Sequence, residues 1–222
     1  MPIVRRVACG FAGGELRIQV ANLKVTHRLT MIFIGAVLTV GGVVAIGMRT
    51  QSELTTYAER LRTLEQAKAI LNHLDTREAE LKVNAYRSVV ESDLSDVMAD
   101  MPDDLASVTE AVAELDAIAV PDHIRAQFDQ VRPDVTQFSE FITAFIADAA
   151  RDQATAMTRE PEIAERNSVV DDKLDALHET VDADIATARA AMAATTARSR
   201  VIALAVGVAG VVLLLILCVP LG

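Results

Sequence analysis

The chain has 222 residues, of which 51% are hydrophobic and only 4% aromatic, and it carries a formal net charge of −10. A nucleic-acid partner requires a basic surface, so this acidic composition argues against one. The apolar residues are mostly Ala, Val, Leu and Ile, and many of them fall in two uncharged runs. This uneven distribution favours a membrane protein.

The first uncharged run, Leu29–Met48, follows a basic tail, residues 1–28, in which five basic residues stand against one acid. A helix needs about 20 apolar residues to cross the hydrocarbon of a bilayer, and this run has that length. A cleaved signal peptide is the alternative, because Ala45-Ile46-Gly47 is a faint cleavage-like motif. Signal peptides, however, have apolar regions of only about 7–15 residues. We therefore predict an uncleaved transmembrane helix.

The second uncharged run, residues 201–221, predicts a second transmembrane helix on the same argument of length. The segment between the runs, residues 49–200, has 16 basic and 30 acidic residues. Short basic flanks stay in the cytoplasm, whereas long loops cross the membrane largely regardless of charge. We expect a two-pass protein whose tail and carboxyl terminus are cytoplasmic and whose segment 49–200 is outside the cytoplasm.

The segment 49–200 has no glycine and only four prolines, whereas β structure with its many turns would need more of both. Apolar residues also recur in alternating steps of three and four, as in helices that pack along a seam. The four seams are Leu54, Tyr57, Leu61, Leu64, Leu71, Leu74 and Leu81; Leu105, Val108, Val112 and Leu115; Ile124, Phe128, Val131, Val135, Phe138, Ile142, Phe145 and Ala149; and Val170, Leu174, Leu177, Val181, Ile185, Ala188 and Met192. They predict an all-α fold, an antiparallel up-down four-helix bundle whose outer helices continue into the two transmembrane helices.

Prolines and acidic residues indicate where the helices reverse. Val120-Pro121-Asp122 predicts a turn, because proline suits a first helical turn and aspartate is favoured at its positive end. The stretch Asp100–Asp104 has the same pattern and predicts the start of the second helix. The first helix is expected to fray near Glu91–Asp96, although the sequence places this turn only within residues 88–103.

The third and fourth helices each contain a proline. Pro133 is expected to kink the third helix without ending it. The fourth helix is expected to start near Asp152 and to be broken or kinked at Pro161. After Pro161 no proline occurs before Pro220, which predicts one stiff helix from the bundle through the second span.

The sequence has two glycines in the second span, Gly207 and Gly210. Glycine lets helices in membranes approach each other closely. These two residues are therefore expected at the contact between the spans.

The stretch NLKVTHRLTMIF (Asn22–Phe33), the helical segment and the second run together resemble the input half of methyl-accepting chemotaxis receptors. Residues 49–200 are most similar to the four-helix-bundle ligand-binding domain of that family. Asp152–Leu177 resembles the entry into the family's fourth helix, with Arg151-Asp152 where the family often has Gly-Asp. The resemblance implies a homodimeric transmembrane sensor of the bacterial inner membrane, involved in chemotaxis and signal transduction.

The resemblance also implies parts that follow the second span in such receptors, a HAMP linker and a cytoplasmic coiled coil. A chemotaxis kinase or adaptor would bind only through that cytoplasmic part, so we expect the chain to be a fragment or a truncated product. Two alternatives remain open. One is the sensor module of a membrane histidine kinase or diguanylate cyclase, and the other is a complete two-span structural or interaction protein.

Ligands of such receptors can bind between subunits, where arginines of the first helix face the dimer axis. The corresponding candidates here are Arg77, Lys82, Asn84, Tyr86 and Arg87. Their donors would suit an anionic ligand. The basic residues are five apart, however, and steps of three or four are needed to share one helix face, which favours a solvated surface with local pairs such as Arg77–Glu80. The ligand, a small molecule or a periplasmic binding protein, is not identified by the sequence.

No pattern of catalytic or metal-binding residues stands out. The sequence has no His-Glu-x-x-His, no glycine-rich phosphate loop and no Gly-x-Ser-x-Gly. Its nearest approach to a Glu-x-x-His pair is Asp175–His178, which has no partner ligands. We predict no enzymatic activity, no cofactor and no metal site.

Overall fold

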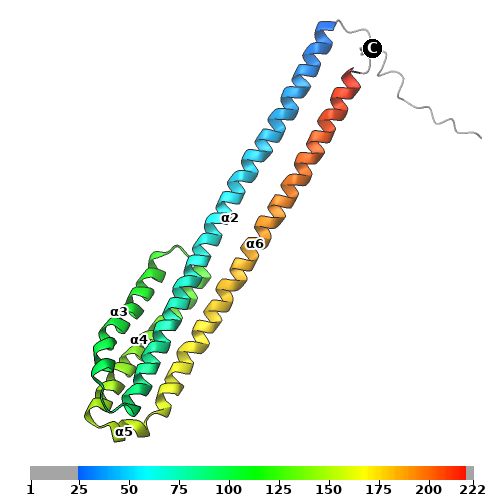
Figure 1. Cartoon of the computed structure of the whole chain (residues 1–222). Helices are drawn as coiled ribbons and strands as arrows, with labels where there is room; N and C mark the ends of the chain where they lie inside the picture. The colour runs from blue at the N-terminus through cyan, green and yellow to red at the C-terminus, as the bar shows by residue number, and fades with distance from the viewer. Residues whose placement is uncertain (1–24, 219–222) are drawn as a thin grey trace, which may run out of the picture. The chain divides into compact units, whose positions relative to one another are not determined.

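The computed structural model describes residues 25–218. Nearly all of them are helical, and no strand occurs among them, so the all-α prediction is confirmed for this range. The predicted tail 1–28 lies almost wholly outside the described residues, as does the end of the second predicted span, residues 219–221. The helices are α2 (Val25–Val90), α3 (Ser95–Ala117), α4 (Asp122–Arg151), α5 (Gln153–Thr158) and α6 (Pro161–Cys218) (Figure 1).

The chain divides into two compact units. One comprises residues 1–54 and 194–222, and with them both predicted transmembrane helices. The other comprises residues 55–193. The boundary falls within α2 and α6, so that each of these helices contributes to both units.

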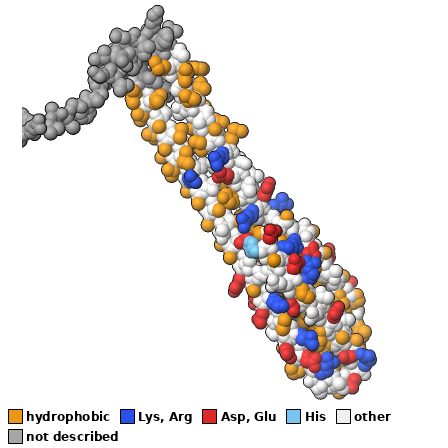
Figure 2. Space-filling model, turned by 180° about the vertical axis from the view of Figure 1, so that it is seen from behind, with side chains coloured by type: hydrophobic (Ala, Val, Ile, Leu, Met, Phe, Trp, Pro, Cys, Tyr) orange, Lys and Arg blue, Asp and Glu red, His pale blue; other side chains and the backbone are white. Residues whose placement is uncertain are grey.

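The unit that contains the two uncharged runs presents large apolar side chains outward. Leu38, Met48 and Leu204 are 70%, 71% and 72% exposed. Figure 2 shows hydrophobic side chains covering this part of the chain, whereas charged side chains are spread over the rest. By length and composition, α2 and α6 each contain a stretch that could cross a membrane. Apolar side chains need no protein cover in lipid, so this surface is the one expected of membrane spans.

Glycines set the contact between the two helices of this unit. A Cβ atom on Gly210 would lie 2.4 Å from Cγ2 of Thr39, and one on Gly35 would lie 3.0 Å from Cδ2 of Leu213. Thr39 in turn donates a hydrogen bond from Oγ1 to the backbone oxygen of Gly35 at 2.8 Å. A Cβ atom on Gly207 would meet nothing within 4 Å. Of the two glycines predicted at the contact, Gly210 is there and Gly207 is not.

In residues 55–193, buried apolar side chains from all five helices form one cluster. Figure 1 shows α2, α3, α4 and the first part of α6 side by side in this unit, with successive helices running in opposite directions. Every predicted seam residue of α4, from Ile124 to Ala149, is buried. The α6 seam is buried from Val170 to Ala188, and Met192 is half-buried. The apolar pattern thus identified the buried faces of these helices correctly.

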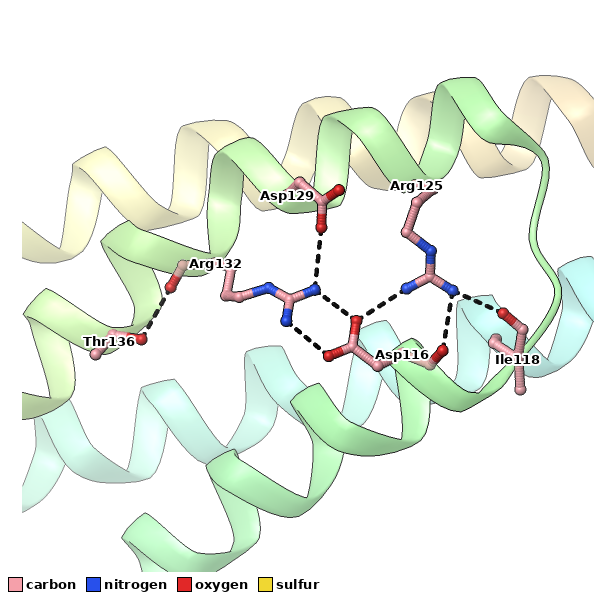
Figure 3. Close-up of polar contacts among 6 residues, drawn as sticks. All are labelled: Asp116, Ile118, Arg125, Asp129, Arg132 and Thr136. Carbon is pink, nitrogen blue, oxygen red and sulfur yellow. Dashed lines mark hydrogen bonds and ion pairs between the residues drawn. The ribbon is translucent and has the colours of Figure 1, made fainter.

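The turn between α3 and α4 forms at the predicted proline, and α4 begins directly after Pro121. Asp116, in the last turn of α3, accepts hydrogen bonds from Arg125 at 3.0 Å and from Arg132 at 2.7 Å (Figure 3). Arg125 also donates to the backbone oxygen of Ile118 at 2.7 Å. The carbonyl groups at a helix end have no intrahelical partner, so Arg125, which also donates to the backbone oxygen of Asp116 at 3.3 Å, caps α3. Both arginines hold α3 against α4 through the Asp116 carboxylate.

Helix α3 begins earlier than predicted. Helix α2 ends at Val90, beside the segment predicted to fray, but α3 starts at Ser95, so that Pro102 lies inside it. Val97 and Met101, which precede the proline, are both buried. Their burial outweighs the single helical hydrogen bond that Pro102 cannot make, which explains why the helix extends back beyond the proline.

The predicted start of the fourth helix also needs correction. Asp152 caps the separate short helix α5, where its carboxylate accepts a hydrogen bond from the backbone N–H of Thr155 at 3.1 Å. Pro161 does not kink a helix but is the first residue of α6. Proline suits that position because its missing N–H would have no intrahelical partner there. Pro133, by contrast, lies inside α4, which continues through it as predicted.

Candidate functional site

The two arginines among the predicted ligand-binding residues pair with carboxylates close by in the sequence, one on α2 and one directly after it. Arg77 makes the predicted ion pair with Glu80, at 2.7 Å between Nη1 and Oε2. Arg87 donates from Nε to the Glu91 carboxylate at 2.8 Å. Both arginine side chains are only about a third or less exposed. An incoming anion would therefore have to displace an existing carboxylate partner from each.

The remaining polar candidates also contact the protein. Asn84 is buried, and its Nδ2 donates to Asp104 of α3 at 2.7 Å. Burial raises the pKa of Asp104, and the charge of Glu80 raises it further. Tyr86 is half-buried against the apolar core, while Lys82 lies on the side of α2 that meets α6. Of the five residues, Asn84 and Arg87 contact each other, because Nη1 of Arg87 donates to Oδ1 of Asn84 at 3.2 Å. Binding of a ligand by the five residues stays a prediction.

Lys82 leads to a polar group between α2 and α6. Its Nζ lies 4.0 Å from the carboxylate of Asp171, which also accepts a hydrogen bond from Nδ2 of Asn167. Asn167 is buried and Asp171 is half-buried. Burial raises the pKa of Asp171, while the positive charge of Lys82 acts against this rise. We call Asp75, Glu78, Lys82, Asn167 and Asp171 the acidic layer.

Glu78, the central member of the acidic layer, was not predicted as a site residue. It is 1% exposed, and neither carboxylate oxygen has a hydrogen-bond partner among the described residues. Burial raises the pKa of Glu78 to about 8, with smaller contributions from the negative charges of Asp171 and Asp75. An unpaired carboxylate is costly in apolar surroundings, so the group is held mostly in its protonated form at neutral pH.

The sequence did contain a signal for this site. The predicted α2 seam passes from Leu74 directly to Leu81, and Glu78 occupies the regular seam position between them. Asn167 occupies the corresponding kind of position in α6, three residues before Val170. Charged residues are mostly exposed in proteins, so residue type places Glu78 on the surface, whereas its position in the heptad pattern places it in the core.

The acidic layer can hold and release a proton. Loss of the proton from Glu78 would place a third negative charge beside Asp75 and Asp171, with Lys82 as the counter-charge identified nearby. Repulsion between these charges would weaken the packing of α2 against α6. Within residues 25–218, no group of three or more His, Cys, Asp or Glu side chains is arranged to hold a metal ion. Perturbed carboxyl groups of this kind gather at functional sites, which makes the acidic layer the candidate site.

Comparisons of the chain with protein-family models, with curated proteins and with solved structures find no match.

Proposed function

We propose that the chain is the input module of a two-span transmembrane sensory receptor of the chemoreceptor type. In this proposal residues 49–200 form an antiparallel four-helix bundle outside the cytoplasm, and the basic tail and the carboxyl terminus are cytoplasmic. The apolar surface of the two spans and the common core of the helices in residues 55–193 support it. The five basic residues of the tail, residues 1–28, agree with a cytoplasmic tail, and a segment as long as 49–200 can cross the membrane largely regardless of its charge.

One observation carries the proposal. Helix α6 is continuous from Pro161 to Cys218, so that a single helix bears Asn167 and Asp171 of the acidic layer near its start and the second span at its end. Packed helices shift between discrete arrangements, and an unbroken helix passes such a shift along its length. A change at the acidic layer can therefore reach the far end of the span as a slide or rotation of α6.

The stimulus that we propose is a change of external pH acting on the acidic layer. A stimulus alters the output only if it favours one helix arrangement over another. Protonated Glu78 favours the packed arrangement, because its neutral form is the one that tolerates burial. Its deprotonation above a pH of about 8 favours an arrangement in which the carboxylate gains access to water.

A chimaeric receptor tests this proposal. The chain is fused to a HAMP-linked chemotaxis output domain, and kinase activity is measured after a step of external pH from 6.5 to 9. Two glycines inserted between Thr196 and Ala197 interrupt α6 and are expected to abolish the response. The matched control inserts seven alanines at the same place, which keep the helix intact and its faces in phase to within about 20°.

The control is expected to retain most of the response, and Glu78→Gln to lose it. Kinase activity that does not change after the pH step contradicts the proposal. A response that is undiminished after insertion of the two glycines contradicts it as well. Direct sequencing of the gene beyond the codon for Gly222 would identify the output domain that follows, if any.

A further inference from the structure

A second polar site lies between α2 and α6, at the edge of the two apolar runs. A cavity of about 290 Å³ opens there, within the unit formed by residues 1–54 and 194–222. Arg49 and Thr50 line it from α2, directly after the first run, and Arg198 and Ser199 line it from α6, directly before the second. The cavity therefore stands at the depth where a membrane span meets the polar region of a bilayer.

Hydroxyl groups connect the two helices at this cavity. Oγ1 of Thr50 lies 3.0 Å from Oγ of Ser199, and either atom can donate the hydrogen bond between them. Each hydroxyl group has one proton and can also accept, so the accepting partner keeps its own O–H for another acceptor. Thr195 adds a third hydroxyl group to the lining. The cavity thus offers hydrogen-bond donors in addition to charge.

The charges of the cavity lining are not balanced. Arg198 is exposed and has no ion-pair or hydrogen-bond partner among the described residues. Arg49 donates to the Glu53 carboxylate at 3.3 Å, with the two side chains 84% and 47% exposed. Exposed ion pairs of this kind contribute little to stability, so an anion can compete with Glu53 for Arg49. Two guanidinium groups facing one carboxylate leave a net positive charge.

We propose that this cavity binds the phosphate group of an anionic lipid. Guanidinium groups bind phosphate oxygens with two parallel hydrogen bonds, and Arg49 and Arg198 approach the cavity from opposite helices. The free hydroxyl proton of the Thr50–Ser199 pair supplies a further donor. A singly charged phosphodiester matches the net charge of the lining.

Two lining residues favour a lipid over a soluble phosphate ester. Ile46 and Ile202 form the side of the cavity toward the apolar runs, where the glycerol and acyl parts of a lipid would lie. Bound in this way, one lipid would contact both helices at their polar ends. The site depends on membrane insertion, which the proposed function also assumes, but it depends on neither signalling nor the acidic layer.

Native mass spectrometry of the full chain in a non-ionic detergent tests the site. The probes are dioleoylphosphatidylglycerol, dioleoylglycerol, which has the same acyl chains without the phosphate, and soluble sn-glycerol 3-phosphate. The variants are Arg198→Gln and the double variant Arg49→Gln with Arg198→Gln. Arg200→Gln is the matched control. It removes the same charge as Arg198→Gln, but the Arg200 side chain, two residues further along α6, does not line the cavity.

The wild-type chain is expected to retain the phosphatidylglycerol and not the dioleoylglycerol. An arginine near a membrane surface is worth about 1 kcal/mol toward an anionic lipid, so Arg198→Gln should raise the Kd for phosphatidylglycerol about five-fold. The double variant should bind still less, and Arg200→Gln should bind like the wild type. These results together would establish the site.

Equal loss in Arg200→Gln and Arg198→Gln would overturn the proposal, because it would indicate a general effect of surface charge. Unchanged binding in the double variant would overturn it as well. Displacement of the lipid by sn-glycerol 3-phosphate would show that the ligand is a soluble ester. Extraction of membranes with alkaline carbonate separates failure of the lipid site from failure of the proposed function. Release of the chain from the membranes contradicts both proposals. Retention of the chain, together with unchanged lipid binding in the double variant, contradicts the lipid site alone.

Discussion

Helices α2 and α4 contribute to the same core by the same heptad spacing, but their seams differ in one respect. The α4 seam is apolar at every predicted position from Ile124 to Ala149, and all of these side chains are buried. Helix α2 has three polar residues at buried positions, Glu78, Asn84 and Ser88, and α6 contributes Asn167. One helix therefore supplies packing alone, and the contact between α2 and α6 combines packing with buried polar groups.

The four buried polar residues are not equivalent. Ser88 donates to the backbone oxygen of Ala85 at 2.7 Å, Asn84 donates to Asp104, and Asn167 donates to Asp171. Glu78 has no such partner among the described residues. Buried polar groups are normally hydrogen-bonded, and the exceptions call for a reason. The other buried polar residues have hydrogen-bond partners, whereas Glu78 is buried without one and can change its charge by losing its proton.

The largest effect is expected where the seam is purely apolar. Phe145 is 0% exposed and its ring centroid lies 5.8 Å from that of Phe141. Phe145→Ala should lower the free energy of unfolding by about 3–5 kcal/mol, because it removes buried surface and leaves a cavity. Urea melts of the full chain in detergent measure this. Val83→Ala, at a position 52% exposed, is the control and should change stability by less than about 0.5 kcal/mol. A loss below about 1 kcal/mol for Phe145→Ala would show that α4 does not pack as described.

The next effect concerns the pH dependence contributed by Glu78. Its pKa is about 8 in the folded chain against an ordinary value of 4.5, so between these values the folded state binds more protons than the unfolded state. Stability should therefore fall as pH rises from 4.5 to 8, by at most about 1.4 kcal/mol per pH unit for this group. Glu78→Gln cannot lose a proton, and it should flatten the dependence between pH 5 and 8 by at most about 3–4 kcal/mol.

Melts at pH 5, 7 and 9 check this expectation, with Glu165→Gln on the exposed surface of α6 as the control. The raised pKa values of Asp104 and Asp171 contribute in the same direction, so some pH dependence should remain in Glu78→Gln. If the stability of Glu78→Gln depended on pH as strongly as that of the wild type, Glu78 would not distinguish the α2 seam from the α4 seam.

The smallest effect is expected at the turn that leads into α4. Asp116→Ala leaves Arg125 and Arg132 without their shared carboxylate, but the side chains are partly exposed to water. The loss of stability should be about 0.5–1 kcal/mol, as for other exposed ion pairs. Glu114→Gln on the same helix is the control and should be neutral. A loss as large as that of Phe145→Ala would mean that polar contacts at the turn, and not the seam, hold α4 in place.

The sequence predicted the apolar part of this fold well, because burial follows the spacing of apolar residues closely. The α4 seam and the turn at Pro121 are examples. Helix starts were less predictable, because a proline is compatible with both the first turn and the interior of a helix, as Pro161 and Pro102 show. Glu78 could not be predicted from its residue type, since its pKa depends on burial by residues far away in the sequence.

The central claim is that Glu78 is buried with its proton, and a direct measurement of its pKa tests this best. The carboxyl carbon of Glu78, labelled with ¹³C and assigned by its loss in Glu78→Gln, can be followed by NMR from pH 4 to pH 10 in the full chain. The structure predicts a midpoint at about 8. A midpoint near the ordinary value of 4.5 would show that water or a cation reaches the carboxylate, and it would contradict the account of the acidic layer.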